Sequence, residues 1–295
     1  ANGYVYRTDL FEDSAEQKAF QDKYGYQLEP PKTYKQLRDI AEFFTRPDQN
    51  LYGIATYFSK EYDGITMGFQ QVMWSFGGSY GDPKTYKVDG YLNSEDSLKA
   101  LEYYKGLVAF SPPDAPNYYW QETLEAYKSG KVAMAMDYFA FLPGAIDPEQ
   151  NPDYHDKSGF FIAPAGPKGQ YISIGGQGMS ISSYSKKEDI AKQYMKWFIQ
   201  KPVQEKWAKL GGFTPHKEVL KSDTFLNATP YNKAFAASFP YLRDFWAIPE
   251  YADLLEACQT NWSAAIVGAK DPKKSLDDIV RKHEEIFEDA GYYNE

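Results

Sequence analysis

Residues 137–141 place one carboxylate and three aromatic rings directly after an apolar run at residues 132–136. A short apolar run of this kind predicts a strand that is buried on both faces. Ligands of α/β proteins bind beyond the carboxyl ends of such strands. There Asp137 could accept hydrogen bonds from sugar hydroxyls while Tyr138 and Phe139 stack on the sugar ring. The alternative is a turn whose rings pack inward, and the residue types favour neither reading.

A glycine-rich stretch follows a short predicted strand at residues 171–174. It reads Gly175-Gly176-Gln177-Gly178 and leads into a second short predicted strand. Glycine adopts backbone angles closed to other residues and lets a ligand approach the main chain. In a chain that otherwise alternates strands and helices, the stretch indicates a hinge beside a cleft.

Aromatic residues make up 17% of the chain, with 26 Tyr, 19 Phe and 6 Trp. Tyrosine and tryptophan combine a flat apolar face with a polar tip, which suits a wet cleft. Trp246 and Tyr251 flank Pro249 in a predicted loop, where exposed aromatics often bind ligands. Phe69 and Gln70, on a predicted helix at 68–76, could reach the same cleft, although a core role for Phe69 is an equal alternative.

Composition excludes several classes of function. The net charge is −9 and the isoelectric point is near 5.0, so a nucleic-acid partner is not expected. The three histidines are far apart and lack metal-ligand spacing. No phosphate-binding loop or nucleophile-elbow motif occurs, so we expect no metal, no cofactor and no catalytic residue. Pairs of carboxylates could serve glycoside hydrolysis, but with 41 acidic residues such pairs arise by chance.

The periodicity of apolar residues predicts alternating strands and helices with a helical tail, typical of α/β layering. Thr33 with Gln36 forms a capping-box pattern, and Ser185 with Glu188 suggests a second helix cap. The predicted strands are at 5–10, 52–58, 132–136, 160–164 and 171–174, and the main predicted helices are at 33–44, 68–76, 95–108, 122–128, 186–198, 202–210, 251–266 and 275–287.

Several short segments agree in order with one family. They are Pro-Pro-Lys-Thr-Tyr at 30–34, Trp-Ser-Phe-Gly-Gly at 74–78, Asn-Ser at 93–94, Gly-Lys-Val-Ala-Met at 130–134, Gly-Gly at 175–176 and Ser-Lys-Lys at 185–187. Their order along the whole chain resembles that of extracellular (periplasmic) solute-binding proteins, family 1, of ABC importers. The resemblance is to the sugar-binding type that includes maltose-binding protein.

The resemblance implies an α/β, periplasmic-binding-protein-like (class II) two-lobe fold that closes around a sugar or polyol. The family places a stacking aromatic after the Ala-Met strand, which corresponds to Phe139, and ligand contacts in the glycine crossing, which correspond to Gly176 and Gln177. A C-terminal aromatic corresponds to the neighbourhood of Tyr251. The implied partner is an ABC permease in the membrane, and the implied location is periplasmic or extracellular, free or lipid-anchored.

The resemblance also divides the chain. Residues 1–178 correspond to the first part of the C-terminal lobe and start at the first interlobe crossing. Residues 179–213 correspond to a segment of the N-terminal lobe, and residues 214–295 to the helical part of the C-terminal lobe. We therefore expect a truncated or split protein that lacks most of the N-terminal lobe. The alternatives to a binding protein are a carbohydrate-active enzyme, such as a glycoside hydrolase, and a standalone lectin-like module.

Overall fold

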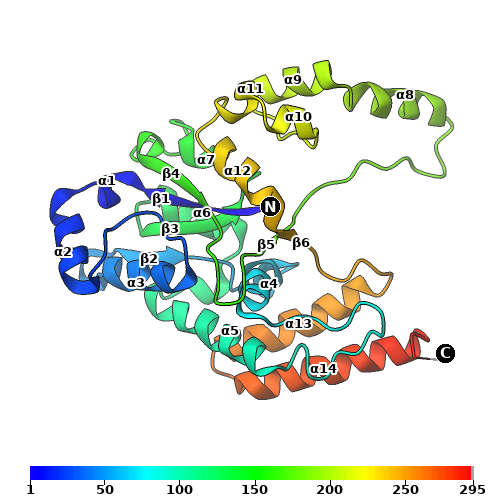
Figure 1. Cartoon of the computed structure of the whole chain (residues 1–295), viewed down its shortest axis with the longest axis horizontal. Helices are drawn as coiled ribbons and strands as arrows, with labels where there is room; N and C mark the ends of the chain where they lie inside the picture. Colours follow the sequence, from blue (N-terminus) through cyan, green and yellow to red (C-terminus); the bar gives the residue numbers. More distant parts are fainter. Residues whose placement is uncertain (294–295) are drawn as a thin grey trace.

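A four-stranded mixed sheet lies at the centre of the computed structural model, which describes residues 1–293 (Figure 1). Its order is β2-β3-β1-β4, with bounds β1 Asn2–Arg7, β2 Tyr52–Ala55, β3 Val132–Tyr138 and β4 Ser158–Ile162. Strand β1 pairs antiparallel with both β3 and β4, while β2 runs parallel to β3. The carboxyl ends of β2 and β3 therefore meet at one edge of the sheet.

Strand β3 is the most buried strand of the sheet, and every residue from Val132 to Asp137 is buried. The apolar run predicted this double-sided burial, and the structure confirms it. Helices α3 (Tyr34–Phe44), α6 (Trp120–Lys128) and α12 (Asn232–Ser238) pack against the strands. The capping box is also confirmed, because the Gln36 amide N–H donates to the Thr33 hydroxyl at the start of α3.

A helical layer lies beside the sheet and consists of α4 (Gly64–Phe76), α5 (Glu95–Gly106), α13 (Tyr251–Ile266) and α14 (Pro272–Asp289) (Figure 1). Helix α4 is buried from Gly64 to Ser75 and ends at Gly77, whose φ of 109° requires glycine. The remaining short helices of this half are α1 (Thr8–Phe11), α2 (Ser14–Tyr24) and α7 (Pro143–Ile146).

Phe69 and Gln70 belong to the core, which corrects their prediction as ligand contacts. The ring of Phe69 is fully buried, and its centroid lies 4.7 Å from that of Trp262. The Gln70 side chain is also buried, and its Oε1 accepts a hydrogen bond from the Tyr80 hydroxyl at 3.0 Å. Helix α4 lies between the sheet and α13, so neither of these side chains has surface to offer a ligand.

Phe139 is a second core residue that the sequence placed in the site. It is 1% exposed, and its ring lies edge-on to Phe235 of α12 with centroids 5.5 Å apart. A side chain at Gly3 of β1 would overlap the same ring, so the glycine allows the close approach. Of the two readings of residues 137–141, inward packing is correct for Phe139.

Two short parallel strands, β5 (Ile172–Ser173) and β6 (Leu242–Arg243), carry the chain out of and back into the body. Residues 174–187 after β5 contain no helix or strand, so the second short strand predicted after the glycines is absent. Helix α8 (Glu188–Phe198) follows and has no buried residue. We call residues 174–198 the arm, and Figure 1 shows it arching away from the body.

The predicted cap of α8 is wrong in detail. The Ser185 hydroxyl accepts from the Lys187 N–H in a local turn and does not cap the helix, which starts at Glu188 without a side-chain cap. Helices α9 (Lys201–Lys209), α10 (Lys217–Leu220) and α11 (Asp223–Leu226) then return to the body. They pack on one another around Ala208 and Val219, and α11 packs on α12, where the ring centroids of Phe225 and Phe235 are 5.9 Å apart.

We expect Phe139→Ala to lower the free energy of unfolding by about 3–5 kcal/mol, because it empties a buried ring volume. Phe141→Ala is the matched control two residues away. Phe141 is half-buried and stacks on Trp120 with centroids 4.4 Å apart, so its loss should cost only about 1 kcal/mol. Urea unfolding of both variants measures the difference, and equal effects would contradict the core placement of Phe139.

His283 of α14 is buried, and its Nε2 lies 2.8 Å from the Leu254 carbonyl and 3.5 Å from the Cys258 sulfur. Burial lowers the pKa of His283 to about 4. The unfolded chain binds this proton below its ordinary pKa of about 6.5, while the folded chain does not until about pH 4. The contribution of neutral His283 to the free energy of unfolding is therefore fully present above pH 6.5. It falls by on the order of 3 kcal/mol as the pH decreases from 6.5 to 4.

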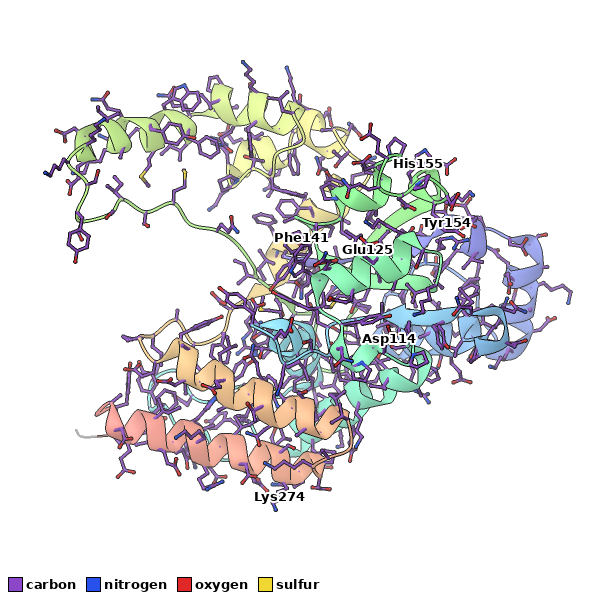
Figure 2. The ribbon with its side chains drawn as sticks, turned by 180° about the vertical axis from the view of Figure 1, so that it is seen from behind. Asp114, Glu125, Phe141, Tyr154, His155 and Lys274 are labelled. Carbon is purple, nitrogen blue, oxygen red and sulfur yellow. The ribbon has the colours of Figure 1, made fainter. Side chains whose placement is uncertain are left out.

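The pH effect is isolated by comparing His283→Gln with the original protein, because a glutamine amide can donate to the same carbonyl but does not titrate. The stability difference between the two should change between pH 6.5 and 4, in favour of the variant at low pH. His155→Gln, at the opposite edge of the molecule from α14, is the control and should show no such change (Figure 2). Parallel pH curves for all three proteins would refute the assignment.

Candidate ligand-binding site

A cluster of tyrosines and two carboxylates forms where β2 and β3 end. Tyr57 lies two residues beyond β2, and Asp137 and Tyr138 end β3. Asp63 precedes the first residue of α4, and Tyr119 precedes the first residue of α6. Five residues from four parts of the sequence meet here because the two parallel strands release their chains at the same edge.

Asp137 is the buried anchor of the cluster. Its carboxyl group accepts hydrogen bonds from the Tyr57 hydroxyl, from the Tyr138 N–H at 2.7 Å and from the Thr123 hydroxyl at 3.3 Å. Burial raises the pKa of Asp137 well above its ordinary value, against the opposing effect of these hydrogen bonds. Asp137 has no exposed surface, so it orients its neighbours and does not contact a ligand, which corrects its predicted role.

Asp63 is the half-buried carboxylate of the cluster. Its Oδ1 accepts a hydrogen bond from the Tyr119 hydroxyl, and its Oδ2 accepts one from the Tyr138 hydroxyl at 3.0 Å. Burial, followed by the charge and hydrogen bond of Asp63, raises the pKa of both tyrosines. Both hydroxyls therefore remain protonated at neutral pH and serve as fixed donors to Asp63.

The rings of the cluster support one another. Tyr57 lies edge-on to Tyr119 at 5.1 Å and tilted to Tyr138 at 5.7 Å between centroids. Phe141 lies edge-on to Tyr138 at 5.8 Å and stacks on Trp120, and both Phe141 and Trp120 are half-buried. Figure 2 places Phe141 near the point where the arm leaves the body. The stack therefore offers a flat aromatic surface beside the Asp63 hydroxyl cluster.

Two more tyrosines extend this surface. Tyr62 is 83% exposed and has a positive φ of 49°, a conformation uncommon for a bulky residue. Tyr251, the first residue of α13, is 39% exposed and lies edge-on to Phe245. Burial, then the charges of Asp63 and Asp244, raises the pKa of Tyr251, with a smaller effect from Tyr62. Tyr251 thus lies in the electrostatic neighbourhood of Asp63.

The remaining predicted residues are dispersed. Gly176 and Gln177 are exposed in the arm, and a Cβ atom at position 176 would have open space around it to 4 Å. Their neighbour Gly175 touches the cluster, because the Tyr138 ring leaves no room there for a side chain. Trp246 is half-buried against Tyr86 and Phe287, with centroids 5.8 and 5.5 Å apart. The structure thus brings Asp137 and Tyr138 together, with Tyr251 nearby, and not the other predicted residues.

Sequence reasoning missed Tyr57, Asp63, Tyr119 and Trp120. Tyr57 lies at the end of the predicted strand at 52–58 and Asp63 follows it, so the rule that singled out residues 137–141 also points to this strand end. Tyr119 and Trp120 carried no such signal, because they lie at the start of a short helix and not after a strand. Among residues 1–293, no three metal-ligating side chains are grouped together, and every helix is too short or too polar to cross a lipid bilayer.

The chain resembles sugar- and polyol-binding proteins in sequence. Mannitol-binding protein of Pseudomonas aeruginosa is 24% identical over 241 residues, which are 81% of this chain and 50% of that protein. Diacetylchitobiose binding protein DasA of Streptomyces coelicolor is 33% identical over 97 residues, 32% of this chain and 23% of the relative. The chain therefore matches half the length of the first relative and 23% of the length of the second.

Solved structures share the fold. Maltose-bound MalE3 of T. maritima superposes with a TM-score of 0.80 at 19% identity, covering 97% of this chain and 70% of that one. A solute-binding protein from Agrobacterium radiobacter in complex with ribitol gives 0.78 at 24% identity, covering 97% and 69%. The α/β periplasmic-binding-protein fold expected from the sequence is thus confirmed.

The sequence pattern of bacterial extracellular solute-binding proteins matches residues 1–205, more than two thirds of the chain. This match confirms the resemblance drawn from the short motifs. The chain belongs to the bacterial extracellular solute-binding protein family.

Proposed function

We propose that the chain binds a sugar or polyol on the surface formed by Asp63, Tyr119, Tyr138, Phe141 and Trp120. The single observation that carries this proposal is the pair of tyrosine hydroxyls held on the half-buried Asp63 carboxylate, beside an aromatic stack. Sugars present hydroxyl groups on their edges and C–H groups on their faces. An aromatic surface and a row of hydrogen-bonding oxygens match both.

The relatives support the ligand class. One is a mannitol-binding protein, and solved structures of similar fold contain ribitol, D-mannitol and maltose. These ligands are uncharged and carry many hydroxyl groups. The proposed role is delivery of such a ligand to an ABC-type permease from a periplasmic or extracellular location, with or without a lipid anchor.

Residues 179–213 form part of a second lobe in this proposal. Helix α8 presents Ile190, Tyr194 and Trp197 at 64%, 53% and 50% exposure, although its sequence is strongly amphipathic. An apolar helix face of this kind is normally buried against another element. In this proposal the occupant is the other lobe of the two-lobe fold, because this chain covers about 70% of the solved relatives.

A glycoside hydrolase is the weaker alternative. It needs two carboxyl groups that both reach the scissile bond. In the cluster only Asp63 is partly exposed, while Asp137 is buried and held by three donors. A standalone lectin-like module would not need the arm, whose exposed apolar face favours a two-lobe protein.

Binding is tested by thermal unfolding with mannitol, ribitol and maltose. A sugar at ten times its Kd should stabilise the protein by about 1.4 kcal/mol, and it should be recovered chemically unchanged. Trp120→Leu should weaken binding about fivefold or more, since stacking on an aromatic contributes about 1 kcal/mol or more. Trp246→Leu is the matched control and should bind normally. Turnover of the sugar, or loss of binding only in Trp246→Leu, would contradict the proposal.

The second-lobe assignment is tested by Ile190→Asp combined with Tyr194→Asp. Both side chains are exposed, so the free energy of unfolding of this chain should change by no more than about 0.5 kcal/mol, and binding of a hydrophobic dye should fall. Phe225→Asp, at a buried position of α11, is the control and should destabilise strongly. Loss of several kcal/mol in the double variant would show that α8 is covered within the chain. A dimer that the double variant dissociates would identify a second copy as the occupant.

A further inference from the structure

The hydrogen bonds around Asp63 determine whether a ligand group placed there must donate or accept hydrogen bonds. A carboxylate offers about four acceptor positions. Tyr119 and Tyr138 each occupy one position on a different oxygen, which leaves acceptor capacity on both oxygens. Since each of these hydroxyls has given its only proton to Asp63, each can only accept a further hydrogen bond. The centre of the site is therefore rich in acceptors and poor in donors.

The charge of Asp63 is not neutralised by a cation. Among residues 1–293, no lysine or arginine forms an ion pair with it, and the nearest in sequence, Lys60, is exposed and also unpaired. Asp137 adds no charge to this surface, because its carboxyl group is buried and its hydrogen-bond donors are neutral. The surface of the cluster thus carries one uncompensated negative charge, at a half-buried position where solvent screening is reduced.

The backbone is strained at the residue next to Asp63. Tyr62 directly precedes Asp63 and keeps a left-handed conformation with its ring in solvent. Such conformations cost free energy and cluster at ligand-binding positions. Tyr62 is the exposed ring next to Asp63 in sequence, whereas the half-buried Tyr138 donates to Asp63 and packs its ring on the buried ring of Tyr57.

We propose that Asp63 is a specificity-determining residue that admits neutral, hydroxyl-bearing ligands and rejects their phosphorylated or carboxylated forms. This inference rests on the proposed function and deepens it by naming the ligand charge. A hydroxyl can donate to Asp63 and to the tyrosine oxygens. A phosphate or carboxylate at neutral pH has almost no proton to donate to these oxygens, and it meets a like charge.

Calorimetric titration of matched pairs tests the inference: mannitol with mannitol 1-phosphate, and ribitol with ribitol 5-phosphate. We expect at least one neutral polyol to bind and its phosphate to bind at least tenfold more weakly. Raising the salt concentration from 0.05 to 0.5 M should narrow that ratio, because part of the discrimination is electrostatic.

Asp63→Asn removes the charge while retaining an acceptor oxygen. It should weaken binding of the neutral polyol about tenfold, since hydrogen bonds to a charged group are the stronger ones, and should reduce the neutral-to-phosphate ratio to about threefold or less. Glu288→Gln is the control, because it removes one exposed negative charge on α14, and it should leave the ratio unchanged. Urea unfolding of each variant verifies that it is folded.

The outcomes separate the two proposals. If no polyol or sugar binds, the proposed function fails. If polyols bind and their phosphates bind equally well or more tightly, the function stands and the role of Asp63 is overturned. This comparison uses the original protein, so it remains decisive even if Asp63→Asn does not fold.

Discussion

The arrangement of the site depends on the buried carboxyl group of Asp137, whose oxygens need hydrogen-bond donors. Asp137 ends a strand that is buried on both faces, and an unpaired polar group there would cost several kcal/mol. The Tyr57 hydroxyl, the Tyr138 N–H and the Thr123 hydroxyl meet this demand from three different segments. The requirement of one interior group therefore fixes the ends of β2 and β3 relative to α6, and with them the tyrosines that approach Asp63.

The sequence predicted strands and helices well where the apolar residues followed a single periodicity. Strand β3 and helices α3, α9 and α13 lie within a residue or two of their expected positions, because buried strands and capped amphipathic helices leave unambiguous patterns. Helix α2 was missed, since it buries only Phe20 and its sequence shows little apolar periodicity. The strand expected after Gly178 does not form, because that segment lies outside the sheet and has no neighbour with which to pair.

The site was harder to predict than the fold, since residue type does not reveal which way an aromatic ring points. Phe139 and Phe141 are two residues apart and chemically identical, yet one packs on Phe235 and the other stacks on Trp120. The choice is made by Gly3 and α12, which approach from distant parts of the chain. Asp137 was found for a sound reason, namely its place after a buried strand, but its depth removes it from the ligand. Asp63, in the connection between β2 and α4, is the carboxylate that remains partly exposed.

Helix α8 and the tyrosine cluster present opposite physical problems. The cluster is internally satisfied: each tyrosine hydroxyl that reaches Asp63 has its acceptor, and the rings cover one another. Among residues 1–293, the apolar face of α8 contacts α9, through Phe198 on Trp207, and most of its other apolar side chains stay exposed. The arm that carries α8 leaves the body beside Tyr138, so in the proposed two-lobe protein the second lobe is joined to the body next to the cluster. A ligand on Asp63 would then lie between two surfaces, and the glycines of the arm would allow the distance between them to change.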